Sequence, residues 1–322
     1  MPHGPVAILD PASPGMRARL ADLCPDFDLR VAEGPDPAQF AAALDGARYA
    51  VTRGLRLPAE LLERAPALRL IHQWGTGIDG IPLEAARARG IAVMRSPGMN
   101  APTVAEAAVA LMLATLRRLP AVQAAFRAGR WDMPDLWRQA RDLGACRVGL
   151  VGMGAIGRET ARRLAGFGCE IAYTRPSGPD PALDLPFRSF DDLLGWSDVL
   201  SLHLPLTPGT RHMVGAAAIA RMKPGAVLIN TARGGLVDEA ALVAALRDGR
   251  IGAAGLDVFE TEPVAGPNPL LEMENTVTLP HVAGRTLDNF DRMVRHWAGN
   301  IRAHATGGQI DPACIVSPGD GR

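Results

Sequence analysis

A cation, a carboxylate and an imidazole each follow an apolar run in the second half of the chain. Arg233 follows AVLINTA, Glu262 comes after AAGLDVF, and His281 follows TVTLP. If these runs are strands of one parallel sheet, the three side chains meet at its carboxyl edge, where such sheets bind ligands. There a guanidinium can bind a substrate carboxylate and polarise a carbonyl, and an imidazolium with a carboxylate neighbour can donate a proton to the developing alkoxide. Each residue alone is more commonly solvated or structural, so the joint placement is what predicts a 2-oxo acid reductase.

A glycine-rich run, GMGAIG, stands between the apolar RVGLV and the helical RETARRLAGFG. In this setting Gly152 permits a tight turn, Gly154 leaves room for a pyrophosphate, and Gly157 lets the helix lie close to the strand. The helix start that follows, with Ala155 and Ile156, is expected to point free N–H groups at the phosphates. The pattern predicts a dinucleotide-binding fold; the alternative is an ordinary strand–turn–helix with incidental glycines.

The end of the next apolar run, CEIAY, indicates which dinucleotide is bound. An NAD-binding protein usually has Asp or Glu there for the adenosine ribose, whereas this chain has Thr174 and then Arg175. No carboxylate stands at this position to repel a 2′-phosphate, and a guanidinium is available to pair with one. Thr174 and Ser177 add hydroxyl donors. The residues favour NADP(H), with NADH possible; the alternative is that Arg175 is a solvated loop residue.

Charge and composition exclude several classes of function. Basic and acidic residues balance at 34 each in 322 residues, which argues against a nucleic-acid or anionic-membrane surface. Lys223 is the one lysine, in a predicted turn, so Schiff-base chemistry is disfavoured. The four cysteines show no paired spacing and no metal-site pattern. With no signal peptide at the start and no apolar helix long enough to span a bilayer, we expect a cytoplasmic protein without metal.

Strands and helices alternate along the chain, which predicts an α/β fold with parallel sheets in about two domains. The first hundred residues read as the smaller unit, and the helical segment from about residue 287 is expected to pack back on it. The domains are therefore predicted as 1–99 with 287–322, and 100–286. The polar tail, residues 317–322, is expected to be disordered.

Long blocks of this chain resemble the D-isomer-specific 2-hydroxyacid dehydrogenases. The matching blocks are AGRW, VGLVGMGAIGR, LHLPLTPGTRHMV, MKPGAVLINTARGGLVDEAAL, AAGLDVFETEP and PHVAGRT. The resemblance implies a Rossmann-type cofactor domain and a discontinuous, flavodoxin-like substrate domain. It implies hydride transfer between C4 of the nicotinamide and C2 of the substrate, with Arg233, Glu262 and His281 in the roles given above.

The same resemblance implies further site residues. Asp257 would meet the nicotinamide carboxamide, and the block LHLPLTP would border the adenosine half of the cofactor. In the turn QWGTGIDG, backbone N–H groups of Thr76 and Gly77 would hold the substrate carboxylate. Trp74 would either face the variable group of the substrate or pack in the core. Beyond the glycine loop and helix start, the implied cofactor contacts are Thr174, Arg175, Ser177, His203, Pro205, Thr231, Ala232, Asp257 and His281.

Within that family the chain is most similar to NADPH-dependent glyoxylate/hydroxypyruvate reductases. Glu262 argues against a formate dehydrogenase, which has glutamine there, and Thr76 stands in a turn where a phosphite dehydrogenase has lysine. We expect reduction of a small 2-oxo acid to the D-2-hydroxy acid by a homodimer in which Trp131 or Trp137 reaches the neighbouring pocket. The alternatives are another 2-oxo acid reductase, such as a 2-ketogluconate or phenylpyruvate reductase, and a non-catalytic dinucleotide-sensing scaffold.

Overall fold

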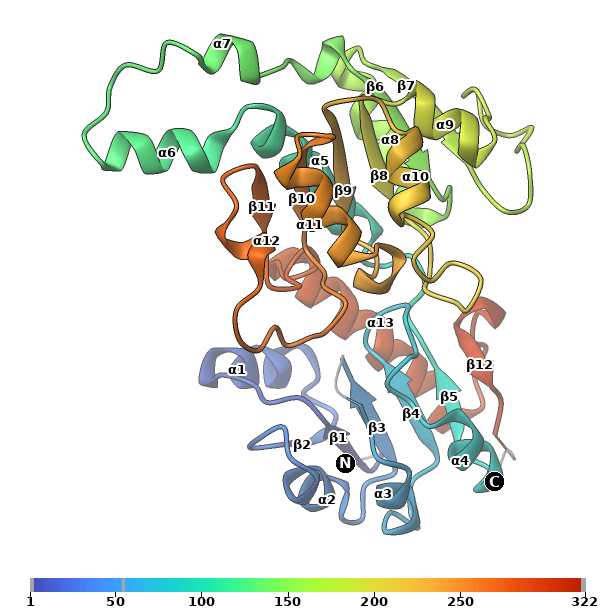
Figure 1. Ribbon diagram of the computed structural model, residues 1–322. Helices are drawn as coiled ribbons and strands as arrows, with labels where there is room; N and C mark the ends of the chain where they lie inside the picture. Colours follow the sequence, from blue (N-terminus) through green and yellow to red (C-terminus); the bar gives the residue numbers. More distant parts are fainter. Residues whose placement is uncertain (1–2, 54–55, 320–322) are drawn as a thin grey trace. The chain divides into compact units, whose positions relative to one another are not determined.

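The computed structural model describes residues 3–53 and 56–319 (Figure 1). Contacts between Cα atoms divide the chain into two units, Met1–Asn100 with Thr286–Arg322, and Ala101–Arg285. Each unit has a wholly or largely parallel sheet between layers of helices, so the predicted α/β class is confirmed. The described residues also form short 3-10 helices: η1 (Leu143–Ala145), η2 (Ala165–Phe167), η3 (Gly234–Leu236) and η4 (Pro312–Cys314).

The sheet of the first unit has the order β2-β1-β3-β4-β5-β12. Its first five strands are parallel, and β12 pairs antiparallel with β5. The order of the parallel strands is that of flavodoxin-like folds, in which the chain changes direction between the first and third strands. The strands are β1 (Pro5–Ile8), β2 (Asp28–Val31), β3 (Tyr49–Thr52), β4 (Leu70–Gln73), β5 (Ala92–Met94) and β12 (Ile315–Ser317).

Helices from both ends of the chain bury the two faces of this sheet. One apolar cluster contains residues of α2 (Pro37–Leu44), α3 (Ala59–Glu63) and α4 (Leu83–Ala88). The opposite cluster contains residues of α1 (Pro14–Leu23) and α13 (Leu287–Thr306). In α13 the buried positions recur at helical spacing, and Trp297 is fully buried. The late segment therefore completes the core of the early one.

The expectation of a disordered tail from residue 317 is wrong at its start. Ser317 is buried and ends β12, where it pairs with Val93 of β5. The register of an edge strand supplies hydrogen bonds that a polar, Gly/Pro-rich composition does not reveal. The last part of that expectation, residues 320–322, lies outside the described residues.

The second unit has a fully parallel sheet of order β7-β6-β8-β9-β10-β11. All five residues of β9 are buried, as expected for a strand covered on both faces. β6 lies between β7 and β8, so the connections leave it in opposite directions and open a crevice beyond the carboxyl ends. The strands are β6 (Arg147–Val151), β7 (Glu170–Thr174), β8 (Val199–Leu202), β9 (Ala226–Asn230), β10 (Ile251–Leu256) and β11 (Thr276–Thr278).

Two helical layers cover this sheet. One layer consists of α5 (Ala101–Leu116) and α8 (Ala155–Leu164). The other consists of α9 (Phe190–Trp196), α10 (Ala216–Arg221) and α11 (Glu239–Arg247). The short α12 (Pro269–Glu272) precedes β11.

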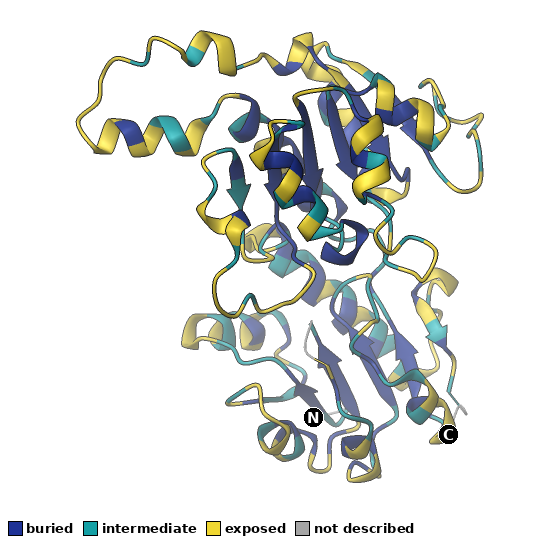
Figure 2. Cartoon of the chain, in the orientation of Figure 1, coloured by how far each residue is buried: buried dark blue, intermediate teal, exposed yellow. Residues whose placement is uncertain are grey.

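The helical path after α5 is broken. α5 ends at Leu116, Arg118 has a φ of 55°, and a new helix, α6 (Leu119–Arg127), begins with proline in its first turn. α6 and α7 (Leu136–Gln139) form an arm that extends from the rest of the second unit and is mostly exposed (Figures 1 and 2).

None of the helices in the described ranges is by itself long and apolar enough to cross a membrane. Only α5 and α6 taken together reach that length and composition, and they are bent by 58° at their junction.

Candidate active site

The glycine loop after β6 has a geometry that side chains would block. Gly152 has a φ of 102°, and a Cβ atom there would lie 2.6 Å from the carbonyl oxygen of His203. A Cβ at Gly157 would lie 2.2 Å from the carbonyl oxygen of Gly152, whereas a Cβ at Gly154 would meet nothing within 4 Å. The first and third glycines therefore allow close packing of the backbone, and the second faces open space at the start of α8, where no side chain caps the helix.

Two polar atoms near this loop are buried without a hydrogen-bond partner among the described residues. They are Nδ1 of His203, just after β8, and Oγ1 of Thr231, just after β9. Burial lowers the pKa of His203 to about 4, so its ring is neutral near pH 7, and its Nε2 lies 3.0 Å from Oγ of Ser201. Buried polar atoms usually have partners, so these two fit a ligand with hydrogen-bonding groups. Together with the glycine loop, they fit a dinucleotide.

A carboxylate lies beside Arg175 at the end of β7. Arg175 donates from Nη1 to Oδ2 of Asp180 at 2.8 Å, and Asp180 also forms an ion pair with Arg158 of α8. The loop turns back at Gly178, which has a φ of 75°. The expectation that no carboxylate stands here is therefore wrong, because Asp180 returns from six residues beyond the strand. Thr174 is buried as the last residue of β7, and Ser177 is exposed.

The predicted imidazole and carboxylate are in contact at the carboxyl edge of the sheet. Nδ1 of His281, after β11, lies 2.6 Å from Oε2 of Glu262, after β10. The second carboxylate oxygen, Oε1, accepts the backbone N–H of Phe259 at 3.0 Å. Burial alone would raise the pKa of Glu262, but these hydrogen bonds and the charges of His281 and Arg233 lower it overall. Glu262 is therefore ionised near neutral pH and holds the ring by one nitrogen.

Asp257, at the end of β10, fixes the turn that carries His281. Its carboxylate accepts the backbone N–H groups of Val282 at 2.7 Å and Ala283 at 3.0 Å, and its carbonyl oxygen accepts that of His281 at 2.8 Å. His281 has a φ of 53°, which is uncommon for a residue other than glycine. Burial raises the pKa of Asp257, and the two N–H groups partly offset this. The family resemblance implies a cofactor contact for this carboxylate, and no pattern in the sequence marks its role in the turn.

The loop that carries Arg233 is fixed by Asn230 and by a close backbone contact. The Asn230 side chain donates to the carbonyl oxygen of Arg233 at 2.9 Å and accepts the N–H of Ala232 at 3.0 Å. A Cβ atom at Gly234 would lie only 1.9 Å from the carbonyl carbon of Phe259. The backbone after β9 therefore lies directly against the loop that leads to Glu262. Asn230 reads as part of an apolar strand, so no sequence signal marked it.

The turn after β4 in the first unit presents backbone donors. Among the described residues, the N–H groups of Thr76 and Gly77 find no acceptor, while the Thr76 hydroxyl donates to the carbonyl oxygen of Ser96 at 3.3 Å. Trp74 is 7% exposed and packs against Trp297, with 5.9 Å between ring centroids. Of the two alternatives for Trp74, the structure supports core packing, and a role in substrate binding stays a prediction.

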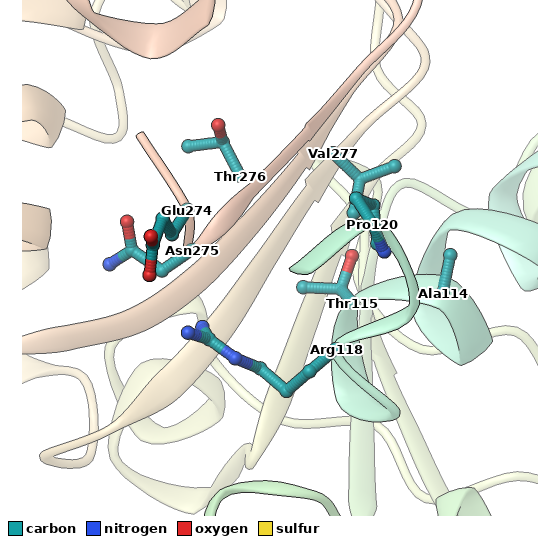
Figure 3. Close-up of a pocket in the computed structure, with 8 residues that line it drawn as sticks. All are labelled: Ala114, Thr115, Arg118, Pro120, Glu274, Asn275, Thr276 and Val277. Carbon is teal, nitrogen blue, oxygen red and sulfur yellow. The ribbon is translucent and has the colours of Figure 1, made fainter. Parts of the chain in front are cut away.

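A small cavity lies at the opposite, amino edge of the second sheet. Arg118 at the α5–α6 break and Thr276 at the start of β11 line it (Figure 3). Its volume of about 10 Å³ suits about one water molecule. His281 follows the other end of β11, so this cavity is separate from the catalytic edge.

Comparison with known proteins places these features in a family. Residues 109–283, more than half of the chain, match the model of the D-isomer specific 2-hydroxyacid dehydrogenase NAD binding domain. The chain is 37% identical over 318 residues to a D-3-phosphoglycerate dehydrogenase of Mycobacterium tuberculosis, covering 98% of this chain but only 59% of that protein. It is 40% identical over 266 residues to a glyoxylate reductase of Korarchaeum cryptofilum, covering 80% of this chain and 79% of the relative.

A solved structure resembles the chain over nearly its whole length. It is the NADPH-dependent glyoxylate/hydroxypyruvate reductase of Sinorhizobium meliloti in complex with NADP and malonate, with a TM-score of 0.82 and 33% identity. The match covers 98% of this chain and 97% of that one. The chain, with its glycine loop and its histidine–glutamate pair, belongs to the D-isomer-specific 2-hydroxyacid dehydrogenases.

Proposed function

We propose that this protein reduces a small 2-oxo acid, of the glyoxylate or hydroxypyruvate type, to the D-2-hydroxy acid, with NADPH favoured over NADH. The observation that carries the proposal is the contact of 2.6 Å between Nδ1 of His281 and Oε2 of Glu262. This pair stands at the same sheet edge as the glycine loop and the loop of Arg233. A similar glyoxylate/hydroxypyruvate reductase was crystallised with NADP, which supports the choice of substrate and cofactor.

The residues act in three roles. Arg233 binds the substrate carboxylate and polarises the carbonyl. His281, oriented by Glu262, donates a proton to the carbonyl oxygen as negative charge develops there. A bound nicotinamide supplies the hydride that reduces the substrate carbon. These assignments are supported by the placement of all three residues after neighbouring parallel strands β9, β10 and β11.

We assign the second unit as the dinucleotide-binding domain and the first as the substrate domain. Thr76 and Gly77, with their unused N–H groups, would hold the substrate carboxylate, and Trp74 would contribute to substrate binding. The residues assigned to the cofactor are Gly152, Gly154, Ala155, Ile156, Gly157, Thr174, Arg175, Ser177, His203, Pro205, Thr231, Ala232, Asp257 and His281. The buried, unpartnered atoms of His203 and Thr231 support this set.

The test is a panel of initial rates with NADPH and, separately, NADH. The substrates are glyoxylate, hydroxypyruvate, pyruvate, phenylpyruvate, 2-ketogluconate and 3-phosphohydroxypyruvate. We expect the largest kcat/KM for glyoxylate or hydroxypyruvate with NADPH. A maximum at 2-ketogluconate or phenylpyruvate would replace the proposed substrate, and a tenfold preference for NADH would overturn the proposed cofactor.

A His281→Ala variant separates an enzyme from a dinucleotide-sensing scaffold. In an enzyme this change lowers kcat by about 10²–10⁴-fold and leaves the Kd for NADPH nearly unchanged. A scaffold would show no turnover in the wild type while still binding NADPH. Fluorescence of bound NADPH gives the Kd independently of turnover.

We further propose a cytoplasmic homodimer joined through the second unit. The exposed aromatic side chains on the arm of α6 and α7 support this: Trp131 is 85% and Trp137 is 73% exposed. The four cysteines are all free, as in a reducing compartment. Light scattering on the wild type and a Trp131→Ser/Trp137→Ser variant tests the dimer; a monomeric wild type would contradict it.

A further inference from the structure

The carboxylate of Asp180 joins two arginines at the end of β7. Arg175 is the first residue after this strand and donates from Nη1 to Oδ2 of Asp180 at 2.8 Å. Arg158 lies in the first turn of α8, directly after Gly157 of the glycine loop, and forms an ion pair with the same oxygen. Both arginines therefore converge on one carboxylate where a dinucleotide-binding fold places the adenosine ribose.

Arg175 is held by its own loop through three hydrogen bonds. Its Nε donates to the carbonyl oxygen of Gly178 at 2.7 Å, and its Nη2 donates to that of Pro179 at 3.1 Å. With Nη1 on Asp180, three of its five N–H donors have acceptors. Of these acceptors Asp180 is the one with a negative charge, so it competes with a 2′-phosphate for the charge of this guanidinium.

Asp180 is held in place and stays ionised. Its backbone N–H donates to the Tyr173 hydroxyl at 2.7 Å, and its Oδ1 accepts the N–H of Ala182 at 3.1 Å. The N–H of Ala182 and the ion pair with Arg158 lower the pKa of Asp180. Only 12% of its side chain is exposed. The negative charge therefore remains between the two arginines when a phosphate approaches.

We propose that Asp180 sets the strength of the NADPH preference by competing with the 2′-phosphate for Arg158 and Arg175. Two guanidinium groups and one carboxylate leave a single net positive charge at this place, and without Asp180 there would be two. The proposal rests on the proposed function, because it concerns the same 2′-phosphate site. It adds that Asp180 weakens the preference for NADPH over NADH that Arg175 provides.

The experiment measures binding of two adenosine fragments by calorimetry, without any turnover. 2′,5′-ADP carries the 2′-phosphate and 5′-AMP does not. The ratio of their affinities therefore measures the contribution of the 2′-phosphate to binding. The variant is Asp180→Asn, which retains an oxygen to accept the N–H of Ala182 but has no charge. The matched control is Asp184→Asn, which removes the same charge from an exposed residue that pairs with nothing else in the described chain.

We expect Asp180→Asn to bind 2′,5′-ADP about tenfold more tightly and 5′-AMP within about twofold of the wild type, which corresponds to about one extra charge-assisted hydrogen bond. The control should leave both affinities unchanged. Unchanged or weaker binding of 2′,5′-ADP by Asp180→Asn would overturn the proposal, because Asp180 would then hold the arginines ready rather than compete with the phosphate. An equal gain in the control would also overturn it, since the effect would be general electrostatics.

Two further comparisons keep the result unambiguous. Asp180→Ala should show the same gain, and loss of 5′-AMP binding in both Asp180 variants would show that this carboxylate builds the site, which contradicts the proposal. Wild-type protein that binds 5′-AMP as tightly as 2′,5′-ADP would overturn the NADPH preference itself. Competition by Asp180 is measured by comparing the affinity of the variant for 2′,5′-ADP with that of the wild type. The NADPH preference is measured by comparing the two fragments in the wild type alone, so failure of one proposal can be distinguished from failure of the other.

Discussion

Nδ1 of His281 lies 2.6 Å from Oε2 of Glu262, and the two residues follow adjacent parallel strands, β11 and β10. The ring is thus held at one nitrogen, and Glu262 leaves its Nε2 available to a reacting group. The other carboxylate oxygen is held by the Phe259 N–H, so the orientation of the ring is fixed through the backbone of a neighbouring loop. The geometry of the histidine–glutamate pair therefore depends on main-chain contacts of the second unit.

Replacing Glu262 by glutamine keeps a hydrogen-bonding partner for the ring but removes its charge. We expect kcat for reduction to fall by about tenfold to a hundredfold, because the ring loses the charged carboxylate that orients it for proton transfer. Glu260→Gln, the same change two residues earlier on the loop, is the control. An equal fall in kcat in both variants would count against a specific role for Glu262.

The Asp257→Asn variant tests whether this carboxylate positions His281. Loss of its charge weakens the hydrogen bonds from Val282 and Ala283, which should cost about 1–3 kcal/mol of folding free energy. We expect kcat to fall by at least tenfold while the Kd for NADPH changes less than about threefold. A rise in Kd as large as the fall in kcat would instead make contact with the cofactor its main role.

Gly234 should tolerate no side chain. A Cβ atom there would be 1.9 Å from the Phe259 backbone, so Gly234→Ala must separate the Arg233 loop from the loop of Glu262. We expect lower kcat/KM together with a lower Tm. Gly299→Ala is the matched control, because a Cβ at this exposed position of α13 meets nothing within 4 Å and alanine favours a helix by up to about 1 kcal/mol. Equal Tm values for the two variants would contradict the argument.

His72 should make the protein less stable in acid. Burial lowers its pKa to about 3, and its ring is satisfied in the neutral form, with Nδ1 donating to the carbonyl oxygen of Gln73 and Nε2 accepting from Asn300. The folded-state pKa lies below the ordinary 6.5, so below pH 6.5 the unfolded chain binds a proton that the folded chain does not. The free energy of unfolding should therefore fall by about 1.4 kcal/mol per pH unit between pH 6.5 and about 3 from this residue.

Urea unfolding at pH 7.5, 6.5 and 5.5 measures this effect. His72→Gln removes the titrating group, so its free energy of unfolding should fall less steeply with acid than that of the wild type. The buried His203, whose pKa is lowered to about 4, adds a similar slope to both proteins. Parallel curves for the variant and the wild type would show that His72 does not contribute.

Much of the fold can be predicted from local sequence patterns, because the chain forms the elements that these patterns indicate. RVGLV predicts a strand because a parallel strand covered on both faces is a continuous apolar run, and it forms β6. The spacing of the glycines in GMGAIG predicts a turn in which the backbone packs closely. In the structure, a Cβ atom at Gly152 or Gly157 would overlap neighbouring backbone atoms. Candidate residues at strand ends were predictable for the same reason, because parallel strands bring their carboxyl ends to one edge.

The contacts that the sequence does not predict form where the chain folds back and brings separated residues together. Asp180 reaches Arg175 only because the loop folds back at Gly178, and no residue pattern encodes that contact. Asn230 reads as part of a strand, yet its amide holds the turn at Arg233. The edge strand β2, DLRV, is only partly buried, so it lacks both the apolar run and a clear alternation.

The interleaving of the two units has a consequence during synthesis. The strands of residues 5–94 leave the ribosome before α13, whose Trp297 fills the core on one face of their sheet. Between them the ribosome makes the whole second unit, Ala101–Arg285, which has its own complete sheet and core. The part translated second is therefore the first that can finish folding. Until α13 emerges, part of the apolar face that it later buries stays exposed beside α1.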